Sequence, residues 1–187
     1  MKDNTKLLLA IAFAAEKHSF QKRKDEAGTP YINHPIQLAL TLAQEGEAEN
    51  ETLLIAAILH DTIEDTETSP KEILQLFGND VLQTVLEVTD NRQLPKQERK
   101  NLQVVNASKK SENARKLKLA DKICNVNDII HHPPDNWPIE RKLEYLDWAE
   151  KILLQLKGTH QALENKLQNL IDEGREIFKT SNTLVAD

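Results

Sequence analysis

Apolar side chains recur at helical spacing along most of this sequence, and no segment shows the alternation expected of a strand. The first such segment covers about residues 4–18 and places its apolar residues on one face. The same pattern predicts further helices over residues 35–45, 51–63, 70–78, 80–88, 95–107, 111–130, 138–157 and 160–178. Residues 19–33 are polar and predict a loop. We therefore expect one all-α domain over residues 1–178, followed by a flexible tail over residues 179–187.

Two helix starts are marked by local signals. Ser69, Pro70 and Glu72 match an N-cap, a proline at the first helical position and a glutamate at the third. Either Ser111 or Asn113 can cap the long helix that follows further along the chain. These signals place the helix boundaries independently of the apolar pattern.

The most apolar helix ends in a cluster of ionisable residues. Residues 53–59 are all apolar, which predicts a helix buried on every side. His60, Asp61, Glu64 and Asp65 follow at its end. In a continuous helix His60 and Glu64 share a face, as do Asp61 and Asp65, because they are four residues apart. Burying such groups is costly unless something compensates, and a divalent metal ion is an effective compensation.

Two further residues complete a candidate metal site. His34 precedes Pro35 at the start of a predicted helix, and Asp121 interrupts the apolar stripe of the long helix. With His60 and Asp61 they offer nitrogen and oxygen donors, which suit Mn²⁺, Fe²⁺, Zn²⁺ or Mg²⁺ better than a thiolate-bound structural zinc. Coordination positions left open for water and substrate would make the site catalytic. The alternative is that the polar end of the apolar helix is simply solvated.

Composition narrows the class of partner. The chain has 187 residues, enough for one domain with a core, and a net charge of -6 argues against nucleic-acid binding through a basic surface. No apolar segment approaches the ~20 residues that cross a bilayer, so no membrane span is expected. The single cysteine, Cys124, excludes an internal disulfide and favours a cytoplasmic location. We interpret it as a buried apolar residue and not as a catalytic thiol.

Four segments carry a resemblance to a known family: Arg23-Lys24-Asp25 and residues 28–35, 59–65 and 119–125. In these segments, and over about residues 7–174, the chain resembles the HD-superfamily hydrolases. The match is with the hydrolase domain of RelA/SpoT proteins, and in form it is similar to the stand-alone small alarmone hydrolases, the metazoan SpoT homologues. The resemblance implies a helical fold and a metal-dependent hydrolase.

The resemblance also implies roles for individual residues. It implies that His34, His60, Asp61 and Asp121 hold a metal ion, usually Mn²⁺. It implies that Glu64 and Asp65 position and activate the attacking water, and either is a candidate for the general base. Contact with the nucleotide substrate is implied for Arg23, Lys24 and Asn125.

Three more residues are expected at the substrate. Lys96 belongs to a second basic group beside Pro95, in a segment that also matches the family. Arg141 and Tyr145 are four residues apart on a predicted helix, so they can reach one pocket together. Trp137, close to that helix, is interpreted as a packing residue.

The implied reaction removes the 3′-pyrophosphate of guanosine tetra- or pentaphosphate, with a small nucleotide as the partner molecule. The bifunctional relatives continue into a synthetase domain, whereas this sequence ends at Asp187, so we expect hydrolysis without synthesis. Two alternatives remain open. The chain is a phosphatase for another nucleotide, such as the 2′-phosphate of NADPH, or it is a module that binds nucleotide without turning it over.

Overall fold

The computed structural model describes residues 5–25, 27–134 and 136–183. The all-α prediction is confirmed: the described residues form helices and loops, with one isolated bridge between Lys22 and Pro30. The elements are α1 (Thr5–Lys17), α2 (Asn33–Leu42), the π-helical turn η1 (Ala43–Glu47), α3 (Glu51–Leu59), α4 (Thr62–Asp65), α5 (Pro70–Phe77), α6 (Asn79–Val88), α7 (Lys96–Val105), the 3-10 turn η2 (Ala107–Lys109), α8 (Glu112–His131), α9 (Ile139–Leu156) and α10 (Gln161–Thr183).

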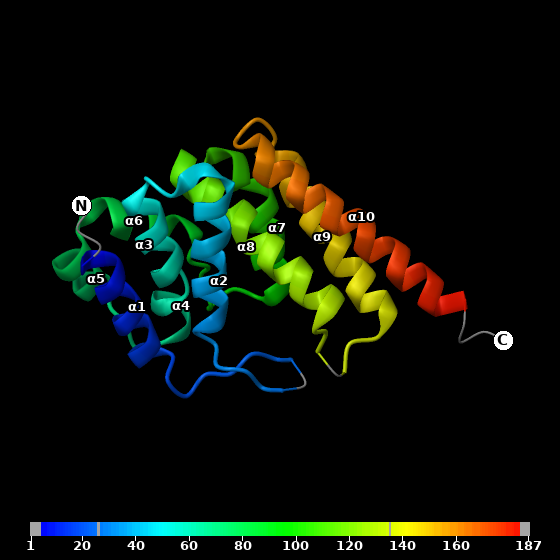
Figure 1. The fold of residues 1–187 in the computed structure, drawn as a ribbon, viewed down its shortest axis with the longest axis horizontal. Coiled ribbons are helices and arrows are strands. Elements are labelled where there is room, and N and C mark those ends of the chain that lie inside the picture. The colour runs from blue at the N-terminus through cyan, green and yellow to red at the C-terminus, as the bar shows by residue number, and fades with distance from the viewer. Residues whose placement is uncertain (1–4, 26, 135, 184–187) are drawn as a thin grey trace.

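The apolar helix α3 lies at the centre of the N-terminal half. All residues from Leu53 to Leu59 are buried, as the pattern predicts. Helices α1, α2, α6 and α8 pack against it. Helix α8 in turn packs against α9 and α10, which lie side by side in the half that carries the C-terminus (Figure 1). The two halves thus share α8, so this helix contacts elements of both.

The predicted helix starts are confirmed where a cap was recognised. Ser69 accepts a hydrogen bond from the backbone N–H of Glu72, and the Glu72 carboxylate accepts one from the backbone N–H of Ser69, 2.8 Å away. Pro70 occupies the first helical position of α5. Of the two candidate caps of α8, Ser111 is the one observed, because its side chain accepts a hydrogen bond from the backbone N–H of Ala114.

Two predicted helices were too long. The helix expected over residues 35–45 becomes regular from Asn33 to Leu42 and then widens into η1, where Gly46 adopts φ 106°, a conformation that favours glycine. The helix expected over residues 51–63 breaks after Leu59 and resumes as the short α4. The apolar pattern continues across this break because the residues on both sides are buried, so periodicity alone missed it.

The last helix continues beyond its expected end at Phe178. Helix α10 extends to Thr183, and within it the Thr180 hydroxyl donates to the Glu176 carbonyl, 2.9 Å away. No glycine or proline interrupts this stretch. Residues 184–187 of the expected tail lie outside the described residues.

At Gly174, α10 packs closely on α8 and α9. A Cβ atom at this position would lie 3.0 Å from Ile130 Cδ1 and 3.0 Å from Leu146 Cδ1. We expect Gly174→Val to lower the free energy of unfolding by ~1–3 kcal/mol, because overpacking forces side chains out of their rotamers. Urea denaturation measures the change. Glu176→Val, at an exposed position of the same helix, is the control. Wild-type stability or better in Gly174→Val would contradict the packing argument, because valine has a higher helix propensity than glycine.

Two loops gather on one side of the molecule. The loop between α1 and α2 and the loop between α8 and α9 both lie at the lower edge of the view in Figure 1. They bracket the start of α2 and the end of α8, where several predicted site residues are found. Among the described helices, none combines the length and the apolar character needed to span a membrane.

Candidate metal centre and adjoining cavities

His60 and Asp61 lie at the break between α3 and α4. The Thr62 hydroxyl donates to the Leu59 carbonyl, 2.7 Å away, and so replaces a backbone bond at the end of α3. The His60 ring places Nδ1 2.8 Å from the Ala57 carbonyl. A carbonyl only accepts, so Nδ1 carries a hydrogen and Nε2 is the ring nitrogen left to bind a metal ion. The break therefore turns the imidazole Nε2 toward the centre of the protein, where a metal ion can take the place of a proton.

Residues distant in sequence meet at this nitrogen. His34, at the start of α2, His60 and Asp121, on α8, each contribute a potential metal-ligand atom, and these atoms lie within 4.8 Å of one another. His34 Nε2 is 3.3 Å from Asp121 Oδ1, and His60 Nε2 is 2.9 Å from Asp61 Oδ2. Asp61 also accepts a hydrogen bond from the Tyr31 hydroxyl. All four predicted metal residues are thus brought together.

The charges of this cluster favour a cation. Although burial disfavours a charged ring, the carboxylates of Asp61 and Asp121 raise the pKa of His60 to about 9. Burial opposes ionisation of Asp121, yet Lys122 and the His34 ring hold its pKa well below the usual range. Burial lowers the pKa of His34. Two carboxylates that stay ionised beside two imidazoles form a site in which a divalent ion can replace a proton.

Unsatisfied ring nitrogens give an independent test of whether a metal fits. Among the described residues, Nδ1 of His34 and Nε2 of His60 are buried and make no well-directed hydrogen bond, although Asp61 Oδ2 lies 2.9 Å from the latter. A buried polar atom without a partner costs about 1–3 kcal/mol. A cation bound at Nε2 of His60 removes that cost and neutralises the adjacent carboxylates. The residues present therefore fit a divalent metal ion with nitrogen and oxygen ligands.

Glu64 lies on the wall of the cavity that contains the metal cluster, whose volume is about 150 Å³. One carboxylate oxygen accepts from the backbone N–H of Asp90, 2.9 Å away, and the other lies 3.7 Å from Arg99 Nη1. Burial, reinforced by the charge of Asp61, raises the pKa of Glu64. A carboxylate whose pKa is raised by burial is a stronger base, and its backbone contact holds it in place.

Asp65 points to a different cavity. Its two oxygens are held by Arg92 and by Gln21, whose Nε2 donates over 2.8 Å. Asp65 lines an adjoining cavity of about 400 Å³ but is not among the residues that line the metal cavity. Glu64 and Asp65 are consecutive residues of α4 and point in different directions: Glu64 faces the metal cluster, and Asp65 faces the cavity beside it.

The adjoining cavity contains most of the predicted substrate residues. Arg23 and Lys24 from the α1–α2 loop, Asn125 from α8 and Tyr145 from α9 all line it. Asn125 also donates to Asp121 Oδ1 over 2.6 Å, which connects this cavity to the metal cluster. The cavity combines cations, an amide and aromatic rings, a mixture suited to a nucleotide.

Two other predicted substrate residues lie elsewhere. The Arg141 guanidinium stacks over the Trp137 ring at 4.2 Å, and Trp137, expected only to pack, lines the adjoining cavity. Arg141 itself does not line that cavity and instead contacts the Trp137 ring, which does. Lys96 is exposed at the start of α7 and lines neither cavity. The structure brings Lys100, one turn further on, over the Trp148 ring at 4.8 Å.

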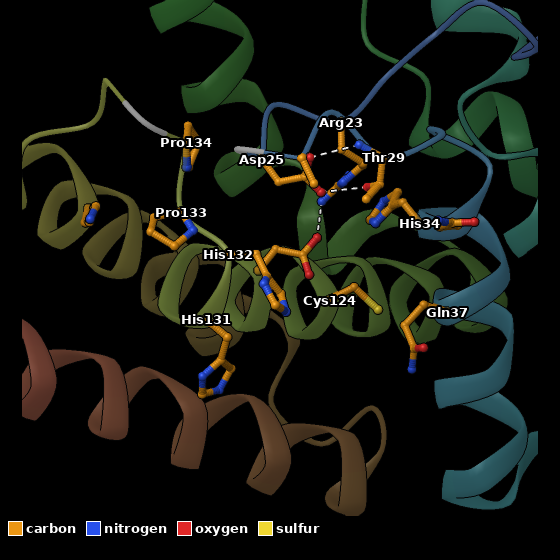
Figure 2. Close-up of a pocket in the computed structure, with 14 residues that line it drawn as sticks. Arg23, Asp25, Thr29, His34, Gln37, Cys124, His131, His132, Pro133 and Pro134 are labelled. Atoms are coloured by element: carbon orange, nitrogen blue, oxygen red, sulfur yellow. Dashed lines mark hydrogen bonds and ion pairs between the residues drawn. The ribbon is translucent and has the colours of Figure 1, made fainter.

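A larger cavity of about 850 Å³ continues beneath the α1–α2 loop. Figure 2 shows Cys124 from α8 and His34 and Gln37 from α2 on its walls, with Arg23 above them. Arg23 pairs with Asp128 at the boundary between this cavity and the smaller adjoining one. Asp25 accepts from the hydroxyl and backbone N–H of Thr29, which closes the loop that presents Arg23.

Cys124 is buried, with 4% of its surface exposed, and its Sγ is 3.8 Å from Thr41 Oγ1. Burial raises the pKa of this thiol to about 12. Because the thiolate is the reactive form, we expect iodoacetamide at pH 8 to modify the folded protein at least about tenfold more slowly than the urea-unfolded chain. Mass spectrometry of timed samples measures the rate. Similar rates in both states would contradict this, and Cys124→Ser provides the blank.

Three residues of the centre were not singled out from sequence. Tyr31 donates to Asp61, Lys122 Nζ lies 2.8 Å from Asp121 Oδ2, and Lys118 lines the metal cavity. Tyr31 and Lys122 fall within segments that carry the family resemblance, so motif membership was their only signal. The sequence signal for Lys118 was its position one turn before Asp121 and Lys122 on the same helix face, where charged residues interrupt the apolar stripe.

Comparison with known proteins gives consistent results. The family model described as "HD domain" matches residues 10–143. The guanosine-3′,5′-bis(diphosphate) 3′-pyrophosphohydrolase MESH1 of Danio rerio is 46% identical over 167 residues, 89% of this chain and 93% of that protein. The protein of the same name from Homo sapiens is also 46% identical, with the same coverage. A solved structure, described as a metazoan orthologue of SpoT that hydrolyses ppGpp, is 42% identical with a TM-score of 0.89, over 92% of this chain and 97% of that one.

Proposed function

The chain belongs to the HD domain family, and we propose that it hydrolyses the 3′-pyrophosphate of guanosine tetra- or pentaphosphate to GDP or GTP and pyrophosphate. One structural observation supports the proposal independently of the similarity to known proteins. The His34, His60 and Asp121 cluster shares its cavity with Glu64, and that cavity adjoins one lined by cations and aromatic rings. Metal ligands, a base and a nucleotide-sized cavity thus occur together.

We assign the metal to His34, His60, Asp61 and Asp121, and propose Mn²⁺ as the ion. The family implies divalent metal dependence, and the nitrogen and oxygen donors suit Mn²⁺. When bound, the ion supplies a Lewis acid for a phosphoryl oxygen and lowers the pKa of a water. Lys122 lies 2.8 Å from Asp121 and orients this ligand from the outer side.

Glu64 is assigned as the general base because it faces the metal cavity. It accepts a proton from the attacking water, whose oxygen bonds to the phosphorus nearer the ribose. The bond between that phosphorus and the ribose 3′ oxygen breaks, and the oxygen leaves as a hydroxyl. The proton that Glu64 accepts balances the one that the 3′ oxygen takes up. Asp65, held by Arg92 and Gln21, is assigned to the substrate side.

The nucleoside is assigned to the adjoining cavity. Arg23 and Lys24 provide charge for the 5′-phosphates, Asn125 connects this cavity to the metal ligand Asp121, and Tyr145 offers an aromatic edge. Arg23 is already oriented by its ion pair with Asp128 and lies 5.7 Å from the Tyr31 ring. The partner is therefore a small nucleotide. We also propose a cytoplasmic location, based on the single buried thiol of Cys124.

A product assay tests the proposal. Pure protein is incubated with Mn²⁺ and guanosine tetraphosphate, and the products are separated by ion-exchange chromatography. We expect GDP and pyrophosphate in equal amounts, loss of activity after chelation, and recovery when Mn²⁺ is restored. A panel with guanosine pentaphosphate, NADPH and deoxynucleotides ranks substrates by kcat/KM. Intact guanosine tetraphosphate at every enzyme concentration would refute the proposal, and a higher kcat/KM for NADPH would assign a different substrate.

A further inference from the structure

A third cavity adjoins the metal centre. Its volume is about 150 Å³, and it lies between the α6–α7 loop, α7 and α8. It shares four lining residues with the metal cavity: Val88, Asp90, Gln103 and Lys118. The adjoining cavity of about 400 Å³ that is assigned to the nucleoside, called the nucleotide cavity from here on, shares a different pair with the metal cavity, Tyr31 and Asn125. The third cavity and the nucleotide cavity have no lining residue in common, so the metal centre lies between them.

Lys118 lies at the boundary between the third cavity and the metal cavity. Only 6% of its surface is exposed, and it comes from α8 one turn before Lys122. Lys122 is neutralised by Asp121, whereas no hydrogen bond or ion pair reaches the Lys118 side chain from the part of the chain that the structure describes. An ammonium group on so buried a side chain is costly when no partner compensates its charge. Its position indicates an anion that is bound during function.

The other walls of the third cavity also favour an anion. Arg99 Nη1 lies 3.7 Å from Glu64, but the Arg99 Nε is buried without a hydrogen-bond partner among the described residues. Lys110 donates to the Glu87 carbonyl. Among the described residues that line the cavity, Asp90 is the one carboxylate, and it accepts from Gln103 Nε2 over 2.6 Å. The third cavity therefore carries an excess of positive charge, from Lys118, Arg99 and Lys110, and it lies beside the metal cavity.

We propose that this third cavity, with Lys118 at its entrance, binds the outer phosphate of the 3′-pyrophosphate group and the pyrophosphate product. The inference rests on the proposed function and adds a specificity element to it. With the nucleoside in one cavity and the inner phosphorus at the metal centre, the outer phosphate reaches the opposite side. A nucleotide with a 3′-diphosphate occupies the nucleotide cavity, the metal centre and the third cavity. A nucleotide with a 3′-monophosphate places no phosphate in the third cavity.

Substitution of Lys118 by methionine tests the proposal, because methionine keeps much of the length and removes the charge. We expect kcat/KM for guanosine tetraphosphate to fall by about tenfold to a hundredfold, the usual effect of one charge-assisted hydrogen bond. Guanosine 5′-diphosphate 3′-monophosphate has no outer 3′-phosphate and so cannot contact Lys118. Its Ki as a competitor should therefore change by less than about twofold in the variant. Lys151→Met, at an exposed position of α9, is the matched control.

A binding measurement makes the test independent of turnover. Calorimetric titration of Mn²⁺-loaded protein with inorganic pyrophosphate and with inorganic phosphate should show tighter binding of pyrophosphate. Lys118→Met should reduce that preference by about tenfold, and Lys118→Arg should retain most of it. If the methionine variant fails to fold by circular dichroism, Lys110→Met, on a less buried wall, should show a smaller loss in the same direction.

The outcomes distinguish this proposal from the proposed hydrolase function on which it rests. Equal losses for the diphosphate and monophosphate nucleotides, or an unchanged preference for pyrophosphate, would overturn the role of the third cavity while leaving hydrolysis intact. If the wild-type protein does not cleave guanosine tetraphosphate, the proposed function fails, and the pyrophosphate titration still decides whether the cavity binds this anion.

Discussion

The His60→Ala variant is expected to lose both its metal ion and its hydrolytic activity. The His60 ring is buried, its Nδ1 is engaged with the Ala57 carbonyl, and its Nε2 is directed at the metal cluster. Alanine removes this donor and leaves Asp61 without the ring beside it. Removing an outer-sphere partner of a metal ligand already costs about 10–100-fold, so removal of a ligand should lower kcat/KM by more than about a thousandfold.

Elemental analysis after dialysis measures the metal, and the product assay measures turnover. We expect about one Mn²⁺ per wild-type chain and almost none in His60→Ala. His131→Ala is the control, because His131 is exposed at the end of α8 and lies 3.8 Å from Glu173, at the surface. Retention of stoichiometric metal and at least a tenth of the wild-type rate by His60→Ala would show that His60 is not a ligand.

The Glu64→Gln variant is expected to keep its metal and to lose turnover. Glutamine has nearly the same shape, and its carbonyl can still accept from the backbone N–H of Asp90, so the fold and the cluster are preserved. The amide cannot accept a proton from water. Loss of a general base costs about 10²–10⁴-fold, and the loss should fall on kcat.

A comparison with Asp65→Asn decides which carboxylate is the base. Asp65 lines the nucleotide cavity, so its variant should raise KM more than it lowers kcat. Glu67→Gln, at an exposed position just after α4, serves as the control and should behave as wild type. If Glu64→Gln retains a near wild-type kcat while Asp65→Asn loses it, the two roles must be exchanged.

The sequence was most informative where local chemistry and global packing agree. The apolar run 53–59 had to be buried, and the caps at Ser69 and Ser111 started helices where they were expected. The apolar pattern failed at the end of that run. Buried residues on both sides hide the break after Leu59, which depends on a side-chain bond from Thr62 to a backbone carbonyl. Periodicity records burial and does not record how a helix ends.

The sequence by itself therefore determined the helical fold and the residue types of the metal centre, because burial patterns and ionisable residues are local properties. Only the tertiary structure decided which side chains meet. It directed Glu64 to the metal cavity and Asp65 to the nucleotide cavity, left Lys96 at the surface, and buried Lys118 beside the centre. These outcomes depend on how α3, α7 and α8 pack against one another. The sequence pattern within one helix shows which of its faces is buried, but it does not show which distant helix covers that face.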